Sequence, residues 1–524
     1  MRLTRDVILT LTVLGLVACT PAEEETVVRV DDVAVVAETA AAEIAWRKED
    51  VLEAFADAAA TGHPILLYWG AEWCPPCHRL RAGLFMDPEF VARTQDFVPV
   101  YLDGDTEGAQ RWGEHFAIAG YPTIILLRPD GTEMTRLSGS EDPDEIDNAL
   151  RAAQENRAGA AELFARAKEA PASLDAEDWT LIASYGWEVD ISGLFADDEK
   201  APLLRSLAAA APDAALQRRF MLLALADDIA RDAPLPAEAS QQEIRALLSA
   251  VFANTAEVKR SRWPLMYDGA ALIERAGGTA DERKTLEDAL VAALDQLYTD
   301  ESLPIVDRVL LVKADIGIHQ LNMGEGAAPP ALLEKVRARA AWADSVAKTP
   351  QERQSAIYYA AGLLQDAGDA EGAERLLTAE LERSATPYYY MPSLAEIAEA
   401  RGDNQQAIDW LKQGYETSSG LATRVQWGVL YASGVLRLTP DDKAGVESAV
   451  DRIIEELGNP DSYHQRTRDR LTGLAMELEE WSQAQAGTEE VLERLRTHMH
   501  EVCAPAQSEE DARAACLSWL ATQA

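Results

Sequence analysis

The chain has 524 residues, of which 48% are hydrophobic, so its length allows two to four domains and its composition supports large buried cores. It carries 48 lysines and arginines against 89 aspartates and glutamates, a formal net charge of −41 at pH 7. Because the acidic residues are spread along the chain without a basic patch, binding to nucleic acid and electrostatic docking on anionic lipid are disfavoured. Glycine-rich phosphate loops and a His-Glu-x-x-His motif do not occur in the sequence, so nucleotide enzymes and metal hydrolases of those types are not indicated.

The first part of the chain has the pattern of a signal peptide. Two arginines precede an apolar run, residues 7–18, that is too short to cross a bilayer. The run ends in Leu-Val-Ala-Cys at residues 16–19, which resembles the signal of bacterial lipoproteins. The resemblance implies that residues 1–18 are removed, that Cys19 carries lipid and that the chain faces the periplasm, where Thr20 favours the outer over the inner membrane. An ordinary signal peptide with an incidental cysteine is the alternative, and both take the chain out of the cytoplasm.

A tether and then a folded domain are expected next. Residues 19–44 begin without helical or strand periodicity, which is typical of a spacer between a membrane surface and a domain. Apolar residues at helical spacing predict a first helix from Arg47 to Thr61, and a similar pattern predicts a last helix from Pro143 to Ala153. We therefore expect a domain over residues 45–154.

Two cysteines follow the apolar run of that domain. Residues 65–69 have strand length, a short turn follows, and Cys74 and Cys77 then open a segment, residues 79–85, that is predicted to be helical. Zinc ribbons use the same cysteine spacing, but zinc requires a second ligand pair and the chain has no second Cys-x-x-Cys. The order strand, Trp-Cys-x-x-Cys, helix therefore indicates redox thiol chemistry with no metal and no cofactor beyond the disulfide.

The two cysteines are expected to have different roles. At a helix N-terminus the Cys74 sulfur meets unpaired backbone N–H groups and the positive end of the helix dipole, which stabilise its thiolate. Pro75 and Pro76 have no N–H, so the nearest amide donor beyond Cys74 itself is that of Cys77, and their rings restrict the loop. We therefore predict that Cys74 is the nucleophile and Cys77 the resolving thiol.

A second motif, Gly-Tyr-Pro-Thr at residues 120–123, precedes another apolar run, residues 124–127. Together with Trp-Cys-x-x-Cys it resembles the thioredoxin family, and residues 77–80, 85–90 and 101–105 are most similar to its periplasmic members. The resemblance implies an α/β thioredoxin-like fold in which Pro122 is a cis-proline opposite the disulfide and Tyr121 offers its backbone to an extended substrate strand. The implied substrate-binding and tuning residues are Trp73, Pro75, Pro76, Tyr121, Pro122 and Thr123.

Three positions depart from that family or leave a choice open. Tyr68 stands where cytoplasmic thioredoxins bury an aspartate, which removes their proton acceptor for Cys77. Glu72 is a candidate replacement or a solvated turn residue. His78 is either a pH-sensitive modulator of the thiolate or, the interpretation we favour, an exposed residue on the helix.

From residue 155 to residue 524 strand-like runs nearly vanish, and Ala, Leu, Glu and Arg fill segments of helical length. Residues 364–377 resemble residues 398–411 at an offset of 34 positions, which is the tetratricopeptide period. A helical-repeat region follows, with its clearest tetratricopeptide-like units at 355–420, and such arrays bind peptides or partner proteins. The tyrosines at 388–390 belong to a recognition surface or, as we favour, to packing between repeats.

Two further cysteines, Cys503 and Cys516, lie near the C-terminus. In an oxidising compartment we expect them to pair in a structural disulfide, worth on the order of 3 kcal/mol in the chain-entropy model. His498 and His500 stand just upstream, so a metal site is one alternative. An electron relay between this pair and Cys74–Cys77 is the other.

Two functions remain in view. The favoured one is a lipid-anchored cell-envelope thiol–disulfide oxidoreductase, in which the helical array binds a client protein that carries thiols or a disulfide. By family analogy, Pro-Pro between the cysteines favours reduction over oxidation, and electrons would come from or go to a membrane electron donor or acceptor. The alternative is an envelope scaffold or a redox-sensing interaction protein in which the repeats do the work.

Overall fold

The computed structural model describes residues 43–139, 143–187, 194, 197–324, 326–459, 462–503, 514 and 516–520. The signal peptide, Cys19 and nearly all of the tether lie outside these residues. Within them, no helix has both the length and the apolar character needed to cross a membrane.

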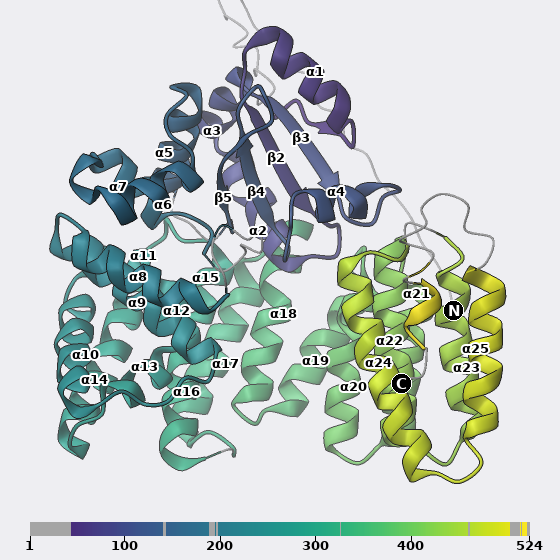
Figure 1. The fold of residues 1–524 in the computed structure, drawn as a ribbon. Coiled ribbons are helices and arrows are strands. Elements are labelled where there is room, and N and C mark those ends of the chain that lie inside the picture. The colour runs from purple at the N-terminus through teal and green to yellow at the C-terminus, as the bar shows by residue number, and fades with distance from the viewer. Residues whose placement is uncertain are drawn as a thin grey trace, which may run out of the picture. The chain divides into compact units, whose positions relative to one another are not determined.

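The first part of the described chain forms a mixed five-stranded sheet with the order β1-β3-β2-β4-β5 (Figure 1). Strand β2 lies at its centre, parallel to β3 and antiparallel to β4. The strands are β1 (Arg47–Lys48), β2 (Ile65–Gly70), β3 (Val98–Asp103), β4 (Thr123–Leu127) and β5 (Glu133–Leu137). The expectation of a helix starting at Arg47 is wrong, because Arg47 and Lys48 pair with β3 and the helix begins only after the Asp50 cap.

Both faces of the sheet are buried, which explains the uninterrupted apolar run of β2. Alternate β2 residues, Ile65, Leu67 and Trp69, belong to one core, whereas Leu66 and Tyr68 face the core that contains both motif cysteines. The helices of this part are α1 (Val51–Thr61), α2 (Pro75–Ala82), α3 (Pro88–Arg93), α4 (Ala109–His115) and α5 (Pro143–Gln154), with 3₁₀ turns η1 (Leu84–Met86) and η2 (Thr94–Asp96). Helix α2 thus starts at Pro75, directly after Cys74, and ends earlier than the sequence suggested.

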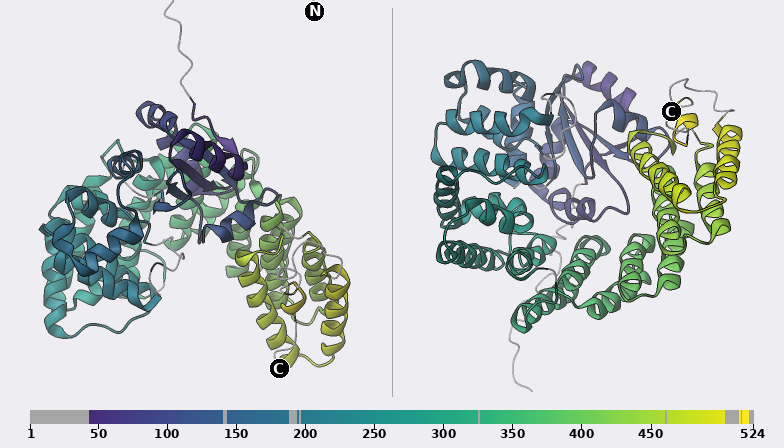
Figure 2. Two further views of the ribbon diagram at one scale, coloured as in Figure 1. Left: turned by 45° about the horizontal axis from the view of Figure 1, so that its top comes forward. Right: turned by 60° about the horizontal axis from the view of Figure 1, so that its bottom comes forward.

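Every further element of the described chain is helical, and neighbouring helices lie side by side along it (Figure 2). Up to residue 310 these are α6 (Ala160–Glu169), η3 (Pro171–Ser173), α7 (Ala176–Ala183), η4 (Asp197–Glu199), α8 (Lys200–Ala210), α9 (Ala214–Ala230), α10 (Glu238–Phe252), α11 (Thr255–Arg260), α12 (Arg262–Tyr267), α13 (Gly269–Ala276), α14 (Ala280–Leu297) and α15 (Ile305–Leu310). The rest are α16 (Lys313–Met323), α17 (Pro330–Val346), α18 (Pro350–Asp366), α19 (Ala370–Leu381), η5 (Pro387–Tyr389), α20 (Met391–Ala400), α21 (Asn404–Thr417), α22 (Leu421–Leu438), α23 (Lys443–Glu456), α24 (Gln465–Ala484) and α25 (Glu489–Cys503). The α/β part followed by a large all-α region is the fold class expected from the sequence.

The 34-residue offset has a local structural basis. Gly368 and Gly402, both with positive φ, end the helices before them, and Asp369 and Asp403 cap α19 and α21 through side-chain oxygens. The same Gly-Asp turn therefore joins α18 to α19 and α20 to α21. Whether the whole array is tetratricopeptide-like stays a prediction.

The α/β part and the first helices after it share one core. The backbone N–H of Gly186 donates to the carbonyl oxygen of Arg136 on β5, at 2.8 Å, and α6 and α7 pack on β5 and α5 respectively. The fully buried Arg136 donates in turn to the carbonyl oxygens of Phe116 and Ala117. The boundary expected at residue 154 is thus a change of architecture rather than a break in packing.

Candidate functional site

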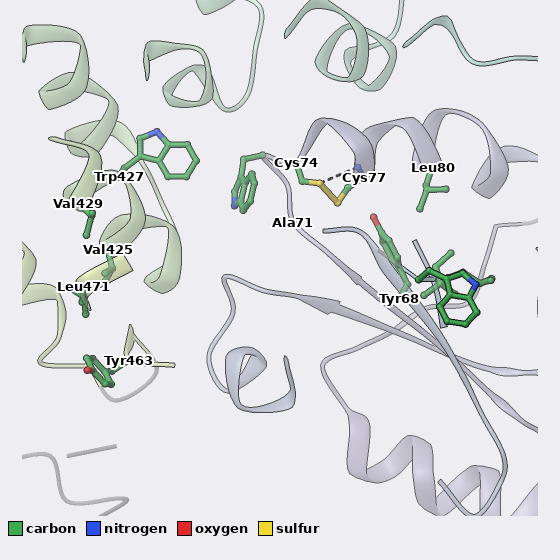
Figure 3. Close-up of a cluster of buried hydrophobic side chains, with 14 of the residues drawn as sticks. Tyr68, Ala71, Cys74, Cys77, Leu80, Val425, Trp427, Val429, Tyr463 and Leu471 are labelled. Atoms are coloured by element: carbon green, nitrogen blue, oxygen red, sulfur yellow. Dashed lines mark hydrogen bonds between the residues drawn. A yellow bond between two sulfur atoms is a disulfide. The ribbon is translucent and has the colours of Figure 1, made fainter. Parts of the chain in front are cut away.

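Cys74 and Cys77 form a disulfide at the start of α2 (Figure 3). Cys74 is the residue that caps the helix, and its sulfur accepts a hydrogen bond from the backbone N–H of Cys77 at 3.2 Å. Pro75 and Pro76 fill the first positions of the helix, where a missing N–H leaves no bond unmade. The sequence prediction that the Cys77 amide is the donor nearest to Cys74 is confirmed.

The disulfide is covered by the helical region. Cys74 is 2% and Cys77 0% exposed, and α18 packs against α2. Beside the disulfide, the ring of Trp73 stacks on Tyr389 at a centroid distance of 5.7 Å and meets Trp427 edge-on at 5.8 Å. Trp427 reaches this position from α22 (Figure 3). Residues that follow the motif by more than two hundred positions therefore cover Trp73 and the helix that carries the disulfide.

The loop before β4 lies against the same tryptophan. The peptide bond between Tyr121 and Pro122 is cis, the geometry that the family resemblance implied. The rings of Tyr121 and Trp73 lie 5.2 Å apart, and the buried Thr123 hydroxyl donates to the carbonyl oxygen of Gly120 at 2.9 Å. The structure thus brings together the residues of the two sequence motifs.

The Tyr121 side chain is held from behind by Gly104 and Gln110. Gln110 Nε2 donates to the Tyr121 hydroxyl at 3.2 Å and also to the carbonyl oxygen of Gly104. A Cβ atom at Gly104 would overlap the Tyr121 hydroxyl, so only glycine admits this packing.

Asp105 joins the motif to the helical region. Its carboxylate accepts from Trp73 Nε1 at 2.7 Å and, on α22, from the backbone N–H and hydroxyl of Thr423 at 3.0 and 2.8 Å. Burial raises the pKa of the Asp105 carboxyl, although these donors act in the opposite direction. This carboxylate fixes the indole orientation next to Cys74.

A second polar contact anchors α2. Arg79 Nε and Nη2 donate to the Asp307 carboxylate at 2.6 and 2.8 Å, and Arg262 Nε donates to it at 2.7 Å. The three side chains are 8%, 0% and 2% exposed, and Arg79 also lies over the ring of Trp263. Burial alone would raise the pKa of Asp307, but the two guanidinium groups hold it below its ordinary value. The helix that carries the disulfide is thus tied to α15 and α12.

Two of the positions that depart from the thioredoxin pattern, Tyr68 and Glu72, differ in burial. Tyr68 is 2% exposed, its hydroxyl has no hydrogen-bond partner, and it points towards the disulfide (Figure 3). Glu72 pairs with Arg81 and its side chain is 62% exposed, so the carboxylate is a solvated turn residue and not a buried proton acceptor.

The expectation that His78 is exposed is wrong. His78 is 8% exposed, and its Nε2 lies 2.6 Å from the carbonyl oxygen of Glu72. Burial lowers the pKa of the imidazole. The reason is that the imidazole packs against the turn before α2, where the Glu72 carbonyl oxygen is its partner.

Cys503 and Cys516 form the second disulfide, and both are buried. Cys503 is therefore not free to act as a thiolate ligand, and His498 Nδ1 instead lies 2.9 Å from Asp451 Oδ1. Across the described part of the chain, no group of three or more His, Cys, Asp and Glu side chains could hold a metal ion.

Several residues of the site were missed by the sequence analysis: Arg79, Asp105, Asp307, Gln354, Trp427 and Arg466. Asp105 and Arg79 lie within stretches that resemble periplasmic thioredoxins, so a signal existed for both. The others come from the helical region, and nothing in the spacing of the sequence connects them with Cys74. Tyr389 belongs to the tyrosine run that we expected to serve packing, and its packing partner is Trp73.

Comparisons with known proteins agree with this geometry. Residues 51–154 match the family model described as a thioredoxin-like domain. A thiol:disulfide interchange protein, DsbD 1, from Pseudomonas aeruginosa is 31% identical over 104 residues, which cover 19% of this chain and 18% of that protein. The chain thus spans under a fifth of the length of this relative. Residues 51–154 form a thioredoxin-like domain with a Cys-x-x-Cys disulfide, joined to a large helical region, and this domain supports thiol–disulfide oxidoreductase chemistry.

Proposed function

We propose that the chain is a thiol–disulfide oxidoreductase in which Cys74 attacks and Cys77 resolves. The Cys74 thiolate attacks one sulfur of a client disulfide, so that a mixed disulfide forms and the other client sulfur leaves as a thiolate. Cys77 then attacks Cys74, which releases the second client thiol and restores the Cys74–Cys77 disulfide. Two electrons pass from the cysteine pair to the client, and the reverse sequence oxidises a client dithiol.

The observation that carries this proposal is the position of the disulfide at the N-terminus of α2. The Cys77 amide bonds to the Cys74 sulfur, and the ring of Trp73 touches the Tyr121 ring of the cis-proline loop. A nearby amide and the helix dipole lower the pKa of a thiol in such a place, which selects Cys74 as the leaving and attacking sulfur. The name of the Pseudomonas relative, a thiol:disulfide interchange protein, points in the same direction.

In this proposal the helical region selects the client. Because the helical region covers Trp73, it must move away from Trp73 or leave one side of it open when the client binds. The direction is reduction, with electrons supplied by a membrane donor. The lipoprotein-like residues 16–19 support lipid attachment at Cys19 and a periplasm-facing position, on the outer membrane in preference to the inner. Radiolabelled palmitate should be incorporated into the wild type and not into a Cys19→Ser variant. Label in both proteins would refute lipid attachment at this cysteine.

A redox sensor is the second candidate, and the cover over the disulfide favours it. Since α18 packs on α2 and Gln354 bonds to the Trp73 carbonyl, reduction of the disulfide would act directly on this contact. A sensor would change its partners on reduction without turning over a disulfide substrate.

The test is a trap in the native envelope. A Cys77→Ser variant should accumulate discrete Cys74-linked adducts on non-reducing gels, since the resolving thiol is absent. A Cys74→Ser variant, with the same number of cysteines, is the matched control and should show none. If Cys77→Ser forms no adduct while the helical region still recovers partners, the oxidoreductase proposal fails and the sensor or scaffold remains.

A further inference from the structure

A cavity of about 240 Å³ lies directly against the cis-proline loop. One wall is the loop itself, residues 118–121, and α4 contributes Gln110 and Glu114. The opposite wall is α24, through Arg466 and Asp469. The cavity is therefore built jointly by the thioredoxin-like domain and the helical region.

Arg466 reaches across this cavity to the redox motif. Its guanidinium lies 4.5 Å from the ring centroid of Tyr121 and 5.6 Å from that of Trp73. Among the described residues Arg466 has no ion pair and no hydrogen bond, and its Nη1 is sealed from solvent. A guanidinium presents five donors in a planar fork, and because Arg466 lines the cavity and is partly exposed, its remaining donors are those that a bound acceptor can reach.

The carboxylates around Arg466 are already engaged or exposed. Glu114 is paired with Arg468 at 2.8 Å and with His464 at 3.5 Å. Asp105 accepts from Trp73 and Thr423, and Asp469 is exposed to solvent. A second arginine, Arg470, lies close by, and its own burial together with Arg466 lowers its pKa. The lining of the cavity thus holds one cation, Arg466, and two carboxylates, of which Glu114 is paired and Asp469 is exposed.

The cavity also lies on the path of a bound substrate. This step rests on the proposed function, in which a substrate joined to Cys74 runs along the backbone of Tyr121. The residues that precede Tyr121 in the same loop line the cavity. A substituent close to the reacting sulfur of the substrate therefore enters the cavity and meets Arg466.

We propose that this cavity binds a carboxylate of the substrate, close to its disulfide, and that Arg466 is the specificity-determining residue. The volume suits a side-chain-sized group. The carboxylate can belong to a small disulfide acid or to an acidic residue beside a client cystine. In both cases the guanidinium supplies the missing counter-charge before Cys74 attacks.

The experiment is a single turnover, so that no external reductant is needed. Protein reduced beforehand and freed of reductant is mixed with one of three small disulfides of similar size: 3,3′-dithiodipropionate, bis(2-hydroxyethyl) disulfide or cystamine. The Cys74–Cys77 pair supplies two electrons, the substrate disulfide is cleaved to two thiols, and the change in tryptophan fluorescence on oxidation of the pair reports the rate. Each rate is divided by the rate at which dithiothreitol reduces the same disulfide, which corrects for differences in intrinsic reactivity between the three disulfides.

We expect the wild type to prefer the anionic disulfide over the neutral one by roughly tenfold, the size of a charge-assisted hydrogen bond, and to react slowest with the cation. Arg466→Gln should abolish this preference, measured as the ratio of the anionic to the neutral rate, and Arg466→Lys should restore part of it. Arg452→Gln on α23 is the matched control, because it removes the same charge from an exposed pair with Glu416 on α21. It should leave the order of the three substrates intact.

The outcomes separate the two proposals. Equal normalised rates of the wild type with all three disulfides would refute the carboxylate site and leave the oxidoreductase function standing. No reaction with any of them would refute both. If Arg466→Gln slows all three substrates equally, Arg466 only holds α24 against the loop and the site is refuted. A second arm uses cystine-containing peptides that carry either Asp or Asn beside the cystine. If the wild type prefers the Asp peptide and Arg466→Gln does not, the carboxylate belongs to protein clients. If the wild type shows no preference between the peptides, the carboxylate belongs to small acids.

Discussion

The carbonyl oxygen of Trp73 accepts a hydrogen bond of 3.4 Å from Nε2 of Gln354, a residue 281 positions further along the chain. Gln354 is itself held from both ends of its amide, because Nε2 also donates to Thr386 and Oε1 accepts from Ser384 and Tyr390. The helical region thus contacts the backbone of the redox motif with a side chain that has no freedom to swing away. The helical region is therefore in direct contact with the backbone next to Cys74.

The first prediction concerns the cover over the disulfide. Tyr389→Ala removes the ring that stacks on Trp73, so Cys74 in the reduced protein should become more accessible. We expect its alkylation by neutral iodoacetamide, followed by mass spectrometry, to quicken by roughly fivefold, since opening would cost about 1 kcal/mol less without the stacked pair. Tyr267→Ala, which removes an exposed tyrosine of the same region, should leave the rate unchanged. Equal rates in wild type and Tyr389→Ala would show that this ring does not control access.

The second prediction concerns the buried Asp307. Asp307→Asn leaves Arg79 and Arg262 buried without a counter-charge, so we expect a loss of about 3–5 kcal/mol in the free energy of unfolding. Asp366→Asn is the matched control, because its pair with Lys313 is partly exposed and should be worth at most about 1 kcal/mol. Chemical denaturation of both variants measures the difference, and comparable losses would contradict the account.

The third prediction gives the pH dependence of that interaction. The folded-state pKa of Asp307 is lower than the value of about 3.9 in an unfolded chain, so its stabilising contribution is fully present above that pH. It is lost as the pH falls through the lowered pKa. Below about pH 4 the wild type should therefore lose stability more steeply than Asp307→Asn, as measured by urea unfolding. Parallel curves would mean that Asp307 titrates normally.

The fourth prediction concerns Tyr68. Its hydroxyl is buried without a partner in the oxidised protein, so Tyr68→Phe should stabilise the oxidised form by about 1 kcal/mol. Burial also raises the pKa of Tyr68, which keeps the hydroxyl protonated and able to donate to a Cys77 thiolate. In the reduced protein the variant should therefore raise the pKa of Cys77, measured by the pH dependence of alkylation. Tyr101→Phe is the control and should destabilise the oxidised protein, because the Tyr101 hydroxyl is bonded to Arg81 and Asp103.

The fifth prediction separates a structural from a relay role for the second disulfide. A Cys503→Ala, Cys516→Ala double variant should lose about 3 kcal/mol of stability in the chain-entropy model. The rate of the Cys74–Cys77 pair with a small disulfide should not change. A slower reaction in a protein that remains folded would instead support electron transfer between the two pairs.

The thioredoxin-like domain could be predicted because its signals are local. The two apolar faces of β2, the Cys-x-x-Cys turn and the Tyr-Pro-Thr loop each lie within a few residues. The helical character of the rest followed from composition, and the Gly-Asp turns at residues 368 and 402 explain why an offset of 34 was visible.

The cover over the site could not be predicted, because each of its contacts joins residues that are far apart. Asp307 finds Arg79 across 228 positions, and Thr423 finds Asp105 across 318. No spacing rule connects such pairs. The burial of His78 was also not predicted, because a single position on a short helix does not show which face is covered. The local error at Arg47 has another cause, since two residues of edge strand next to a helix carry no periodicity of their own.

The central claim is that Cys74–Cys77 is a working redox pair although it is buried. The most direct measurement is a redox titration of the intact protein in buffers of reduced and oxidised dithiothreitol, with the thiols counted by mass spectrometry and the fold followed by circular dichroism. We predict a reversible two-electron transition of this pair while the fold remains native. If the pair is reduced only when the protein unfolds, the disulfide is structural and not a working redox pair.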